Sequence, residues 1–309
     1  MPLYSSDLPD QVRAACASVA ERARSVRLDE AALRDYAGTL GTAEPPEPDP
    51  ATHFAEGDPE ARAAFVVCLG AINFGSGWWP TIRKRPGHSG YRTIAAGVTE
   101  RFREDGPWTV GELRAMTPAA IAAVTGQEAD HPLMADFAGA LRDVGARVGD
   151  EHGGRFLALV EAGDGSAPAL AGLLAGWRAF ADASSYAGAP VPFFKRAQLV
   201  AADLDRFVAP LTGVERLTAF ADNLVPHVLR VDGVLRLGED LAARIDAGEL
   251  LDHGSPEEVE LRACAVHAVE LLSAASGLSA AEVDLALWTR GGEPSYKARP
   301  RPRSRNTAY

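Results

Sequence analysis

One acidic residue lies in an apolar stretch where a negative charge is unexpected. Asp222 belongs to the segment LTAFADNLVPHVL, which we expect to be a buried helix ended by Pro226. The apolar stripe of this helix contains Leu217, Phe220, Ala221 and Leu224. The helix dipole disfavours a carboxylate near a helix C-terminus unless a cation faces it. Two interpretations stay open at this point: a salt bridge at the helix end, and a functional acid that faces a transient positive charge.

Lysine usage singles out a second residue. Only three of the 31 basic residues are lysine, namely Lys84, Lys195 and Lys297. Lys195 lies in PFFKRAQ, between two phenylalanines and the start of a predicted helix. A compact ammonium group at such a place suits a phosphate or carboxylate contact. A solvated lysine at a helix start is the alternative.

Ring-bearing side chains flank the helix predicted over Ala61–Ile72. Asn73 and Phe74 open the loop NFGSGWWP, which contains the neighbouring Trp78 and Trp79. Adjacent tryptophans in a loop either pack on the domain or stack on a planar ligand. The whole segment from Gly75 to Gly90 is irregular, and loops of this length are more often functional than accidental.

His53 and Phe54 precede the same helix. A neutral histidine beside a phenylalanine suits a heterocycle, although a lone histidine is more commonly a surface or capping residue. The sequence contains no GxGxxG after a strand, GxxxxGK[ST], HExxH or GxSxG motif, and its seven histidines are scattered. We therefore expect neither a catalytic metal nor a cofactor.

Composition limits the partners of the protein. The 309 residues include 31 basic and 42 acidic ones, so the formal net charge is −11. A chain this acidic is poorly suited to long nucleic acids, although a small phosphorylated ligand needs only local donors. The opening MPLYSSDLPD is not typical of a secretion signal, and no run of about 20 apolar residues is present. We expect a cytoplasmic protein that does not bind membranes. Three cysteines in apolar surroundings are predicted to be buried free thiols: Cys16, Cys68 and Cys264.

The elements that position these residues are predicted to be helical. Apolar residues recur at helical spacing in Val12–Val26, Ala61–Ile72, Met134–Val148, Ala167–Ala181, Ala197–Val208 and Val259–Leu272. Thr117-Pro118 and Ser255-Pro256 are typical helix starts, and Ser255 with Glu258 predicts a capping box. Strand signals are limited to Val228–Leu237, where an Asp-Gly pair predicts at most a small β-hairpin.

We therefore predict one all-α domain over residues 1–309. Residues 1–50 form an N-terminal helical extension that ends in the proline-rich linker Thr42–Pro50, and Ser184–Pro192 is a second break between helices. Lys297–Tyr309 is a basic tail.

An ordered set of segments is similar to the queuosine salvage family, the queuosine 5′-phosphate N-glycosylases. From about residue 53 to the C-terminus these segments are HF, GDPEARAAFVVCLGAINF, PFFKRAQLVAADL, LTAFADNLVPHVL, AARIDAGELL, SPEEVELRACAVHAVELL, VDLALW and RSRNTAY. The resemblance implies an all-α fold related to the helical DNA glycosylases. It also implies hydrolysis of queuosine 5′-monophosphate, with release of the 7-deazaguanine base queuine.

The same resemblance implies roles for individual residues. The family's acid lies in a Phe-Ala-Asp motif, which makes Asp222 the catalytic residue and gives it the cationic sugar of the transition state as its partner. His53 and Asp284 match residues that hold the base, and Lys195 would hold the 5′-phosphate or orient the site. Glu260 and Arg262 are expected to form a structural ion pair. Side chains expected to contact or enclose the substrate are Phe54, Asn73, Phe74, Trp78, Trp79, Phe220 and Trp288.

The sequence departs from the family pattern around the expected base pocket. Asn223 and Leu224 replace a Tyr-Arg pair, His227 replaces a glutamine, and Thr289 replaces an acid; Asn223, His227 and Thr289 are therefore included among the expected substrate contacts. Residues 75–77 also lengthen the loop after Phe74. The reaction class is thus a firmer expectation than the substrate. Two alternatives remain: a binding protein for a modified nucleoside or nucleotide that has lost turnover, and a nucleic-acid-binding protein that uses the basic tail.

Overall fold

The computed structural model describes residues 7–41 and 47–309, and nearly all of its regular structure is helical. The prediction of an all-α protein is therefore confirmed. The helices are α1 (Leu8–Arg22), α2 (Glu30–Ala37), α3 (Pro59–Ala71), α4 (Gly90–Asp105), α5 (Val110–Arg114), α6 (Pro118–Thr125), α7 (Pro132–Glu151), α8 (Phe156–Ala162), α9 (Ala167–Ala175), α10 (Lys195–Phe207), α11 (Leu224–Val231), α12 (Glu239–Asp246), α13 (Pro256–Ser276), α14 (Ala280–Gly291) and α15 (Pro294–Lys297).

Four short strands form two antiparallel pairs. β1 (Val26–Leu28) pairs with β4 (Leu235–Leu237), and β2 (Ala183–Tyr186) pairs with β3 (Ala189–Pro192). The β2–β3 turn at Ala187 and Gly188 has φ values of +48° and +81°, which is the geometry that a two-residue hairpin needs. The sequence predicted only a break between helices over Ser184–Pro192, and the hairpin was not foreseen.

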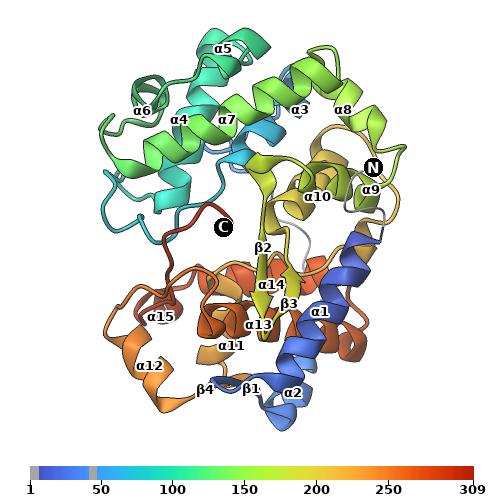
Figure 1. The fold of residues 1–309 in the computed structure, drawn as a ribbon, viewed down its shortest axis with the longest axis vertical. Helices are drawn as coiled ribbons and strands as arrows, with labels where there is room; N and C mark the ends of the chain where they lie inside the picture. The colour runs from blue at the N-terminus through green and yellow to red at the C-terminus, as the bar shows by residue number, and fades with distance from the viewer. Residues whose placement is uncertain (1–6, 42–46) are drawn as a thin grey trace.

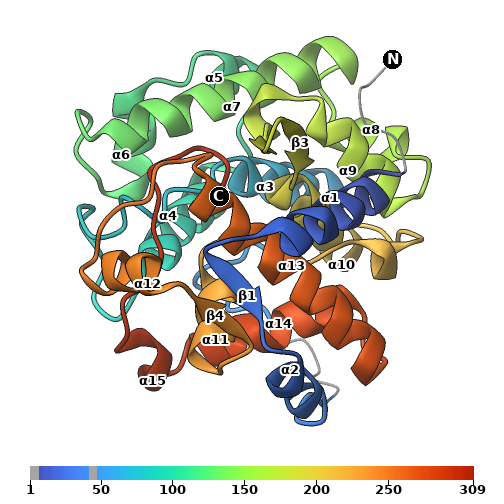
Figure 2. The ribbon, with the colours of Figure 1, turned by 60° about the horizontal axis from the view of Figure 1, so that its bottom comes forward.

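The helices lie in two halves with the hairpin β2–β3 between them (Figure 1). One half contains α3 to α10, in which α10 packs against α3 and α9 while α7 packs against α5 and α6. The other half contains α11 to α15 together with α1 and α2. The chain end lies at the level where the halves meet, as both Figure 1 and Figure 2 show.

Helix α13 is the central helix of the second half. It is buried over most of its length and contacts α1, α2, α11 and α14. Helix α1 buries Leu8, Val12, Cys16 and Val19, and α1 and α2 both pack on α13. All three cysteines are buried and free, as predicted.

Most of the predicted helices are confirmed, with shifted ends. Val26 belongs to β1 instead of the first helix, and α9 ends at Ala175 because Gly176 follows it. Thr117 and Ser255 cap their helices as predicted. The reciprocal half of the Ser255 capping box is absent, because the Glu258 carboxylate instead accepts hydrogen bonds from Gly254 N and the Tyr309 hydroxyl.

Two local predictions were wrong. Val228–Leu237 is not a hairpin: Val228–Val231 ends α11, Gly233 at φ +80° closes the helix, and β4 pairs with β1 far away in the sequence. The helix expected over Leu217–Leu224 is also absent. α11 begins only at Leu224, and Pro226 lies in its first turn, where the missing N–H of proline costs nothing.

The opening segment MPLYSSDLPD and the proline-rich linker Thr42–Pro50 fall partly on residues 1–6 and 42–46, which lie outside the described residues. In the described ranges, no single helix is long and apolar enough to cross a membrane. Only α13 and α14 together, bent by 111°, reach the length and composition of a span.

Candidate active site

Asp222 lies at the start of α11, not at the end of a helix. Its Oδ1 accepts hydrogen bonds from Leu224 N at 2.6 Å and Val225 N at 3.2 Å. The positive end of the α11 dipole therefore favours a negative charge on this half-buried carboxyl group. The sequence predicted that the helix dipole would disfavour a negative charge on Asp222. The structure shows the opposite, because the N-terminus of α11 favours an anion.

The non-helical segment that carries Asp222 is held by three buried side chains from three helices. Gln198 of α10 accepts from Thr218 N at 2.9 Å, and Asp284 of α14 accepts from Phe220 N at 2.9 Å. Arg262 of α13 donates through Nε to Ala221 O at 3.0 Å. These contacts fix the backbone immediately before Asp222, so the position of the carboxylate is a property of the tertiary structure.

Lys195, the first residue of α10, is buried and is therefore not a solvated lysine. Burial lowers the pKa of its ammonium group, and the negative charge of Asp222 is the strongest influence that raises it again. The Lys195 Nζ also lies 3.5 Å from the carbonyl oxygen of Asn73. Lys195 thus stands within reach of both Asp222 and the residues that follow α3.

Asp284 is close enough to Asp222 and Lys195 for their charges to influence its pKa. Its side chain is buried, and burial, followed by the charge of Asp222, raises its pKa to about 8. The N–H of Phe220 and the charge of Lys195 oppose this shift without cancelling it. At neutral pH Asp284 is therefore mostly protonated.

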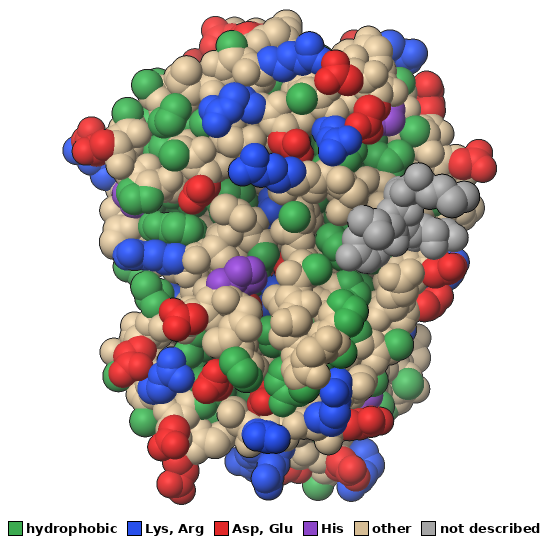
Figure 3. Space-filling view, viewed as in Figure 1, with side chains coloured by type: hydrophobic (Ala, Val, Ile, Leu, Met, Phe, Trp, Pro, Cys, Tyr) green, Lys and Arg blue, Asp and Glu red, His purple; other side chains and the backbone are tan. Residues whose placement is uncertain are grey.

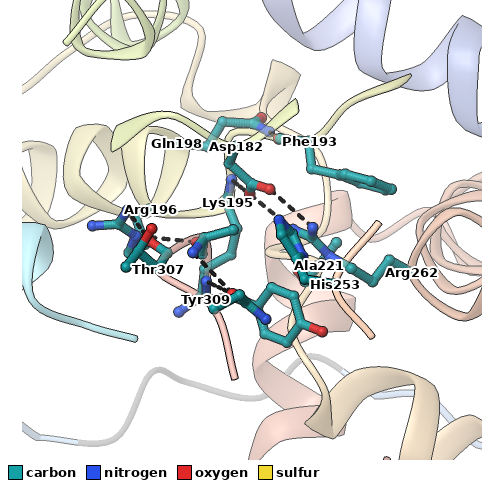
Figure 4. A network of polar contacts seen from close by, with 12 residues as sticks. Asp182, Phe193, Lys195, Arg196, Gln198, Ala221, His253, Arg262, Thr307 and Tyr309 are labelled. Atoms are coloured by element: carbon teal, nitrogen blue, oxygen red, sulfur yellow. Dashed lines mark hydrogen bonds and ion pairs between the residues drawn. The ribbon is translucent and has the colours of Figure 1, made fainter. Parts of the chain in front are cut away.

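A buried ion pair links the segments that carry Asp222 and Lys195 (Figure 4). The Arg262 guanidinium bonds both carboxylate oxygens of Asp182, at 2.9 and 2.8 Å. Asp182 Oδ2 in turn accepts from Lys195 N at 3.0 Å, while Arg262 Nε donates to Ala221 O. The Arg262 guanidinium also lies 3.9 Å from the centre of the Phe193 ring. The predicted Arg262–Glu260 pair was wrong, because residues two apart on a helix point in different directions.

Glu260 makes different contacts on another face of α13. Its Oε2 accepts hydrogen bonds from the backbone N–H groups of residues 24, 25 and 26, and its Oε1 accepts from the Tyr186 hydroxyl at 2.7 Å. Glu260 therefore anchors the start of β1 and the β2–β3 hairpin and does not contact the segment of Asp222.

The chain end is part of this region and not a solvated basic tail. Tyr309 is buried, its hydroxyl donates to Glu258 at 2.7 Å, and its ring lies 4.3 Å from the Arg262 guanidinium. Arg196 holds the backbone by bonding the carbonyl oxygens of Thr307 and Ala308. In Figure 3, histidine and basic side chains lie in the middle of the face shown, where the two halves meet. A small hollow of about 220 Å³ beside Asp222 is lined by Tyr309, Arg303 and Arg262, among others.

A larger hollow, of about 420 Å³, lies on the Asn73 side of Lys195. It is lined by His53, Phe54, Ala55, Phe65, Val66, Leu69, Gly70, Asn73, Tyr91, Asp203 and Phe207. We call it the α3 cavity. The sequence analysis singled out three of its residues, His53, Phe54 and Asn73. It missed Tyr91, Asp203 and Phe207, because Asp203 and Phe207 looked like ordinary members of the α10 pattern and Tyr91 had no distinguishing neighbour.

Burial lowers the pKa of His53, so its imidazole is neutral at neutral pH. The His53 ring lies 5.7 Å from that of Phe207, and Phe54 packs at similar distances against Phe65 and Phe102. The α3 cavity is therefore an aromatic hollow with a few polar groups, a composition typical of sites for flat heterocycles.

The remaining predicted contact residues lie outside the lining of the α3 cavity. Phe74 packs against Phe137 and Arg196, and the Trp79 ring packs against Gly90. Trp78 is buried, Phe220 is half-buried and Thr289 is exposed, and the exposed fraction of Trp288 is 46%.

Two of the substituted positions have structural partners. His227 is buried with Nε2 2.9 Å from Tyr296 O, and the Asn223 side chain donates to Pro302 O and lines the small hollow beside Asp222. Of the described side chains, no three His, Cys, Asp or Glu residues are grouped in a way that would hold a metal ion.

Comparison with known proteins identifies the family of this chain. Residues 52–308 match the family model described as queuosine salvage protein. A queuosine 5′-phosphate N-glycosylase/hydrolase of Sphaerobacter thermophilus is 31% identical over 308 residues, covering 94% of this chain and 95% of that protein. Proteins of the same name from Dictyostelium discoideum and Bos taurus are 26% and 29% identical, over 81% and 60% of this chain and 79% and 57% of their own lengths. The chain therefore belongs to the queuosine salvage protein family, as the sequence motifs predicted.

Proposed function

We propose that this protein hydrolyses the N-glycosidic bond of queuosine 5′-monophosphate, or of a closely related 7-deazapurine nucleotide, and releases the base. The observation that carries the proposal is that two carboxyl groups, Asp222 and Asp284, both act electrostatically on the buried Lys195, whose Nζ lies 3.5 Å from the carbonyl oxygen of Asn73 in the lining of the α3 cavity. The activity in the names of the family members supports the same reaction.

Asp222 is the catalytic carboxylate in this proposal. When the bond between the sugar carbon and the base nitrogen breaks, its electron pair leaves with the base and positive charge develops on the sugar. A carboxylate at the N-terminus of α11 either stabilises that charge or attacks the sugar carbon. Water then supplies the hydroxyl group of the free ribose 5-phosphate, and the base takes up one proton.

Asp284 is the proton donor for the leaving base. A carboxyl group with a pKa raised to about 8 holds a proton at neutral pH and can give it up as the base acquires electrons. Lys195 adjoins both these acids and Asn73 of the α3 cavity, and its ammonium group would bind the phosphate or a sugar hydroxyl. The base would occupy the α3 cavity, between the rings of His53 and Phe54.

The test is base release from queuosine 5′-monophosphate, followed by chromatography, with guanosine and adenosine 5′-monophosphates as control substrates. We expect the wild-type protein to release queuine only from the modified nucleotide, and Asp222→Asn to reduce kcat by about 10³-fold or more with an unchanged melting temperature. Binding of queuosine 5′-monophosphate without release by the folded wild type would contradict hydrolysis and favour a binding protein. Release from a different deazapurine nucleotide would correct the substrate and leave the reaction class intact.

A further inference from the structure

The α3 cavity contains one acidic side chain that the proposed chemistry does not use. Asp203 comes from α10 and lines the cavity together with Phe54 and Phe65. In the described part of the chain, its carboxyl group has no hydrogen-bond or ion-pair partner, and no lysine or arginine is among the residues that line the cavity. A carboxylate in an apolar hollow is costly unless a cation or a proton accompanies it.

The residues around Asp203 suit a ligand that has a flat apolar part and a polar part. The rings of Phe54, Phe65 and Phe207 form the aromatic wall, and the polar atoms of Asn73 and Tyr91 share the cavity with Asp203. Burial raises the pKa of Asp203 to about 7, against the opposing charges of Arg206 and Lys195. At neutral pH the Asp203 carboxyl group is therefore partly protonated, and a cation bound beside it would displace the proton.

We infer that Asp203 is a specificity-determining residue whose carboxylate pairs with an alkylammonium group attached to the base. This inference rests on the proposed function for the identity of the ligand. Queuine is a 7-deazaguanine whose 7-position carries a secondary amine, cationic at neutral pH, that joins it to a cyclopentenediol. Ordinary purine bases carry no such cation, so an acid at this place selects for the modified base and not merely for a purine shape.

Binding of free bases tests the inference without turnover. We would measure by titration calorimetry the affinities of three bases for wild type and Asp203→Asn. The bases are queuine, 7-aminomethyl-7-deazaguanine, which keeps an ammonium group but lacks the diol, and 7-deazaguanine, which lacks both. Asp205→Asn is the matched control, because Asp205 is on the same helix but accepts from Leu211 N outside the cavity.

We expect Asp203→Asn to weaken both ammonium-bearing bases by about 10- to 100-fold and to change 7-deazaguanine less than about 2-fold. Wild type should also release about half a proton on binding queuine at pH 7, seen as a dependence of the binding heat on the buffer, and Asp203→Asn should not. Asp205→Asn should behave as wild type in both measurements.

Three results would overturn the inference: equal weakening of all three bases, no weakening of any, or a loss confined to queuine, which would assign Asp203 to the diol. No binding of any base to the folded wild type would overturn it as well. Asp203-dependent binding of queuine by a wild type that releases no base from queuosine 5′-monophosphate would instead contradict only the proposed function.

Discussion

Two regions adjoin Lys195, and they are built by different means. In one region, the acid side, Asp222 and Asp284 are held by backbone N–H groups and by the buried Arg262–Asp182 pair, so charged groups are fixed in place. In the other region, the cavity side, the α3 cavity is walled mainly by aromatic and aliphatic side chains with few hydrogen bonds among them. Under the proposed function, the acid side carries out the reaction and the cavity side selects the base. Substitutions on the acid side should therefore change kcat, and those on the cavity side should change KM.

Among the substitutions that test the division between the acid side and the cavity side, Asp284→Asn should have the largest effect on kcat. Loss of a proton donor to the leaving base should lower kcat by about 10²-fold or more. In wild type, a raised pKa of about 8 means that activity is present at lower pH and falls as the pH rises through about 8. A pH profile of kcat checks both points: the fall near pH 8 should be absent in Asp284→Asn. The same alkaline limb in both proteins would remove Asp284 from the role of acid.

Arg262→Lys should lower kcat by about 100-fold with little change in KM. Lysine keeps the charge beside Asp182 but cannot bond its two oxygens and Ala221 O together, so Asp222 and Lys195 lose their shared support. Because the chain has only three lysines, the Lys195 amine can be followed by NMR with labelled lysine. Its pKa should fall in Arg262→Lys, since Asp222 raises it in the wild type.

Glu260→Gln is the control for that substitution. Glu260 lies two residues earlier on α13 and is as buried as Arg262, but it anchors residues 24–26 and Tyr186. Both variants should lower the melting temperature, whereas only Arg262→Lys should lower kcat and shift the pKa of Lys195. Equal kcat losses in the two variants would show that Arg262 acts through general stability alone.

His53→Ala should have the smallest effect, and it should change KM and not kcat. The imidazole is neutral and lines the α3 cavity without contacting the acid side, so its loss should raise KM by about 10-fold and leave kcat within about 2-fold. Steady-state kinetics on queuosine 5′-monophosphate would measure both. A fall in kcat with unchanged KM would place His53 in the reaction and break the division between the two sides.

The position of Asp222 shows how much of the candidate site the sequence could predict. The Phe-Ala-Asp motif identified the residue, but the spacing of Leu217, Phe220 and Leu224 predicted the wrong local structure. Apolar spacing indicates which residues are buried, and an extended segment packed between helices buries residues as effectively as a helix does. Its backbone partners, Gln198, Arg262 and Asp284, are 20 to 64 residues away in sequence, so no local pattern could reveal them.

The sequence by itself determined the helical class, most helix positions, the buried thiols and the family, because helical periodicity, capping residues and ordered motifs are local features. Only the tertiary structure decided that Asp222 caps α11, that Arg262 pairs with Asp182, and that the basic chain end is buried. It also brought Asp203 into the α3 cavity with His53. The physical reason is that burial and charge pairing depend on neighbours from distant segments, and these neighbours raise the pKa of Asp284 and of Asp203.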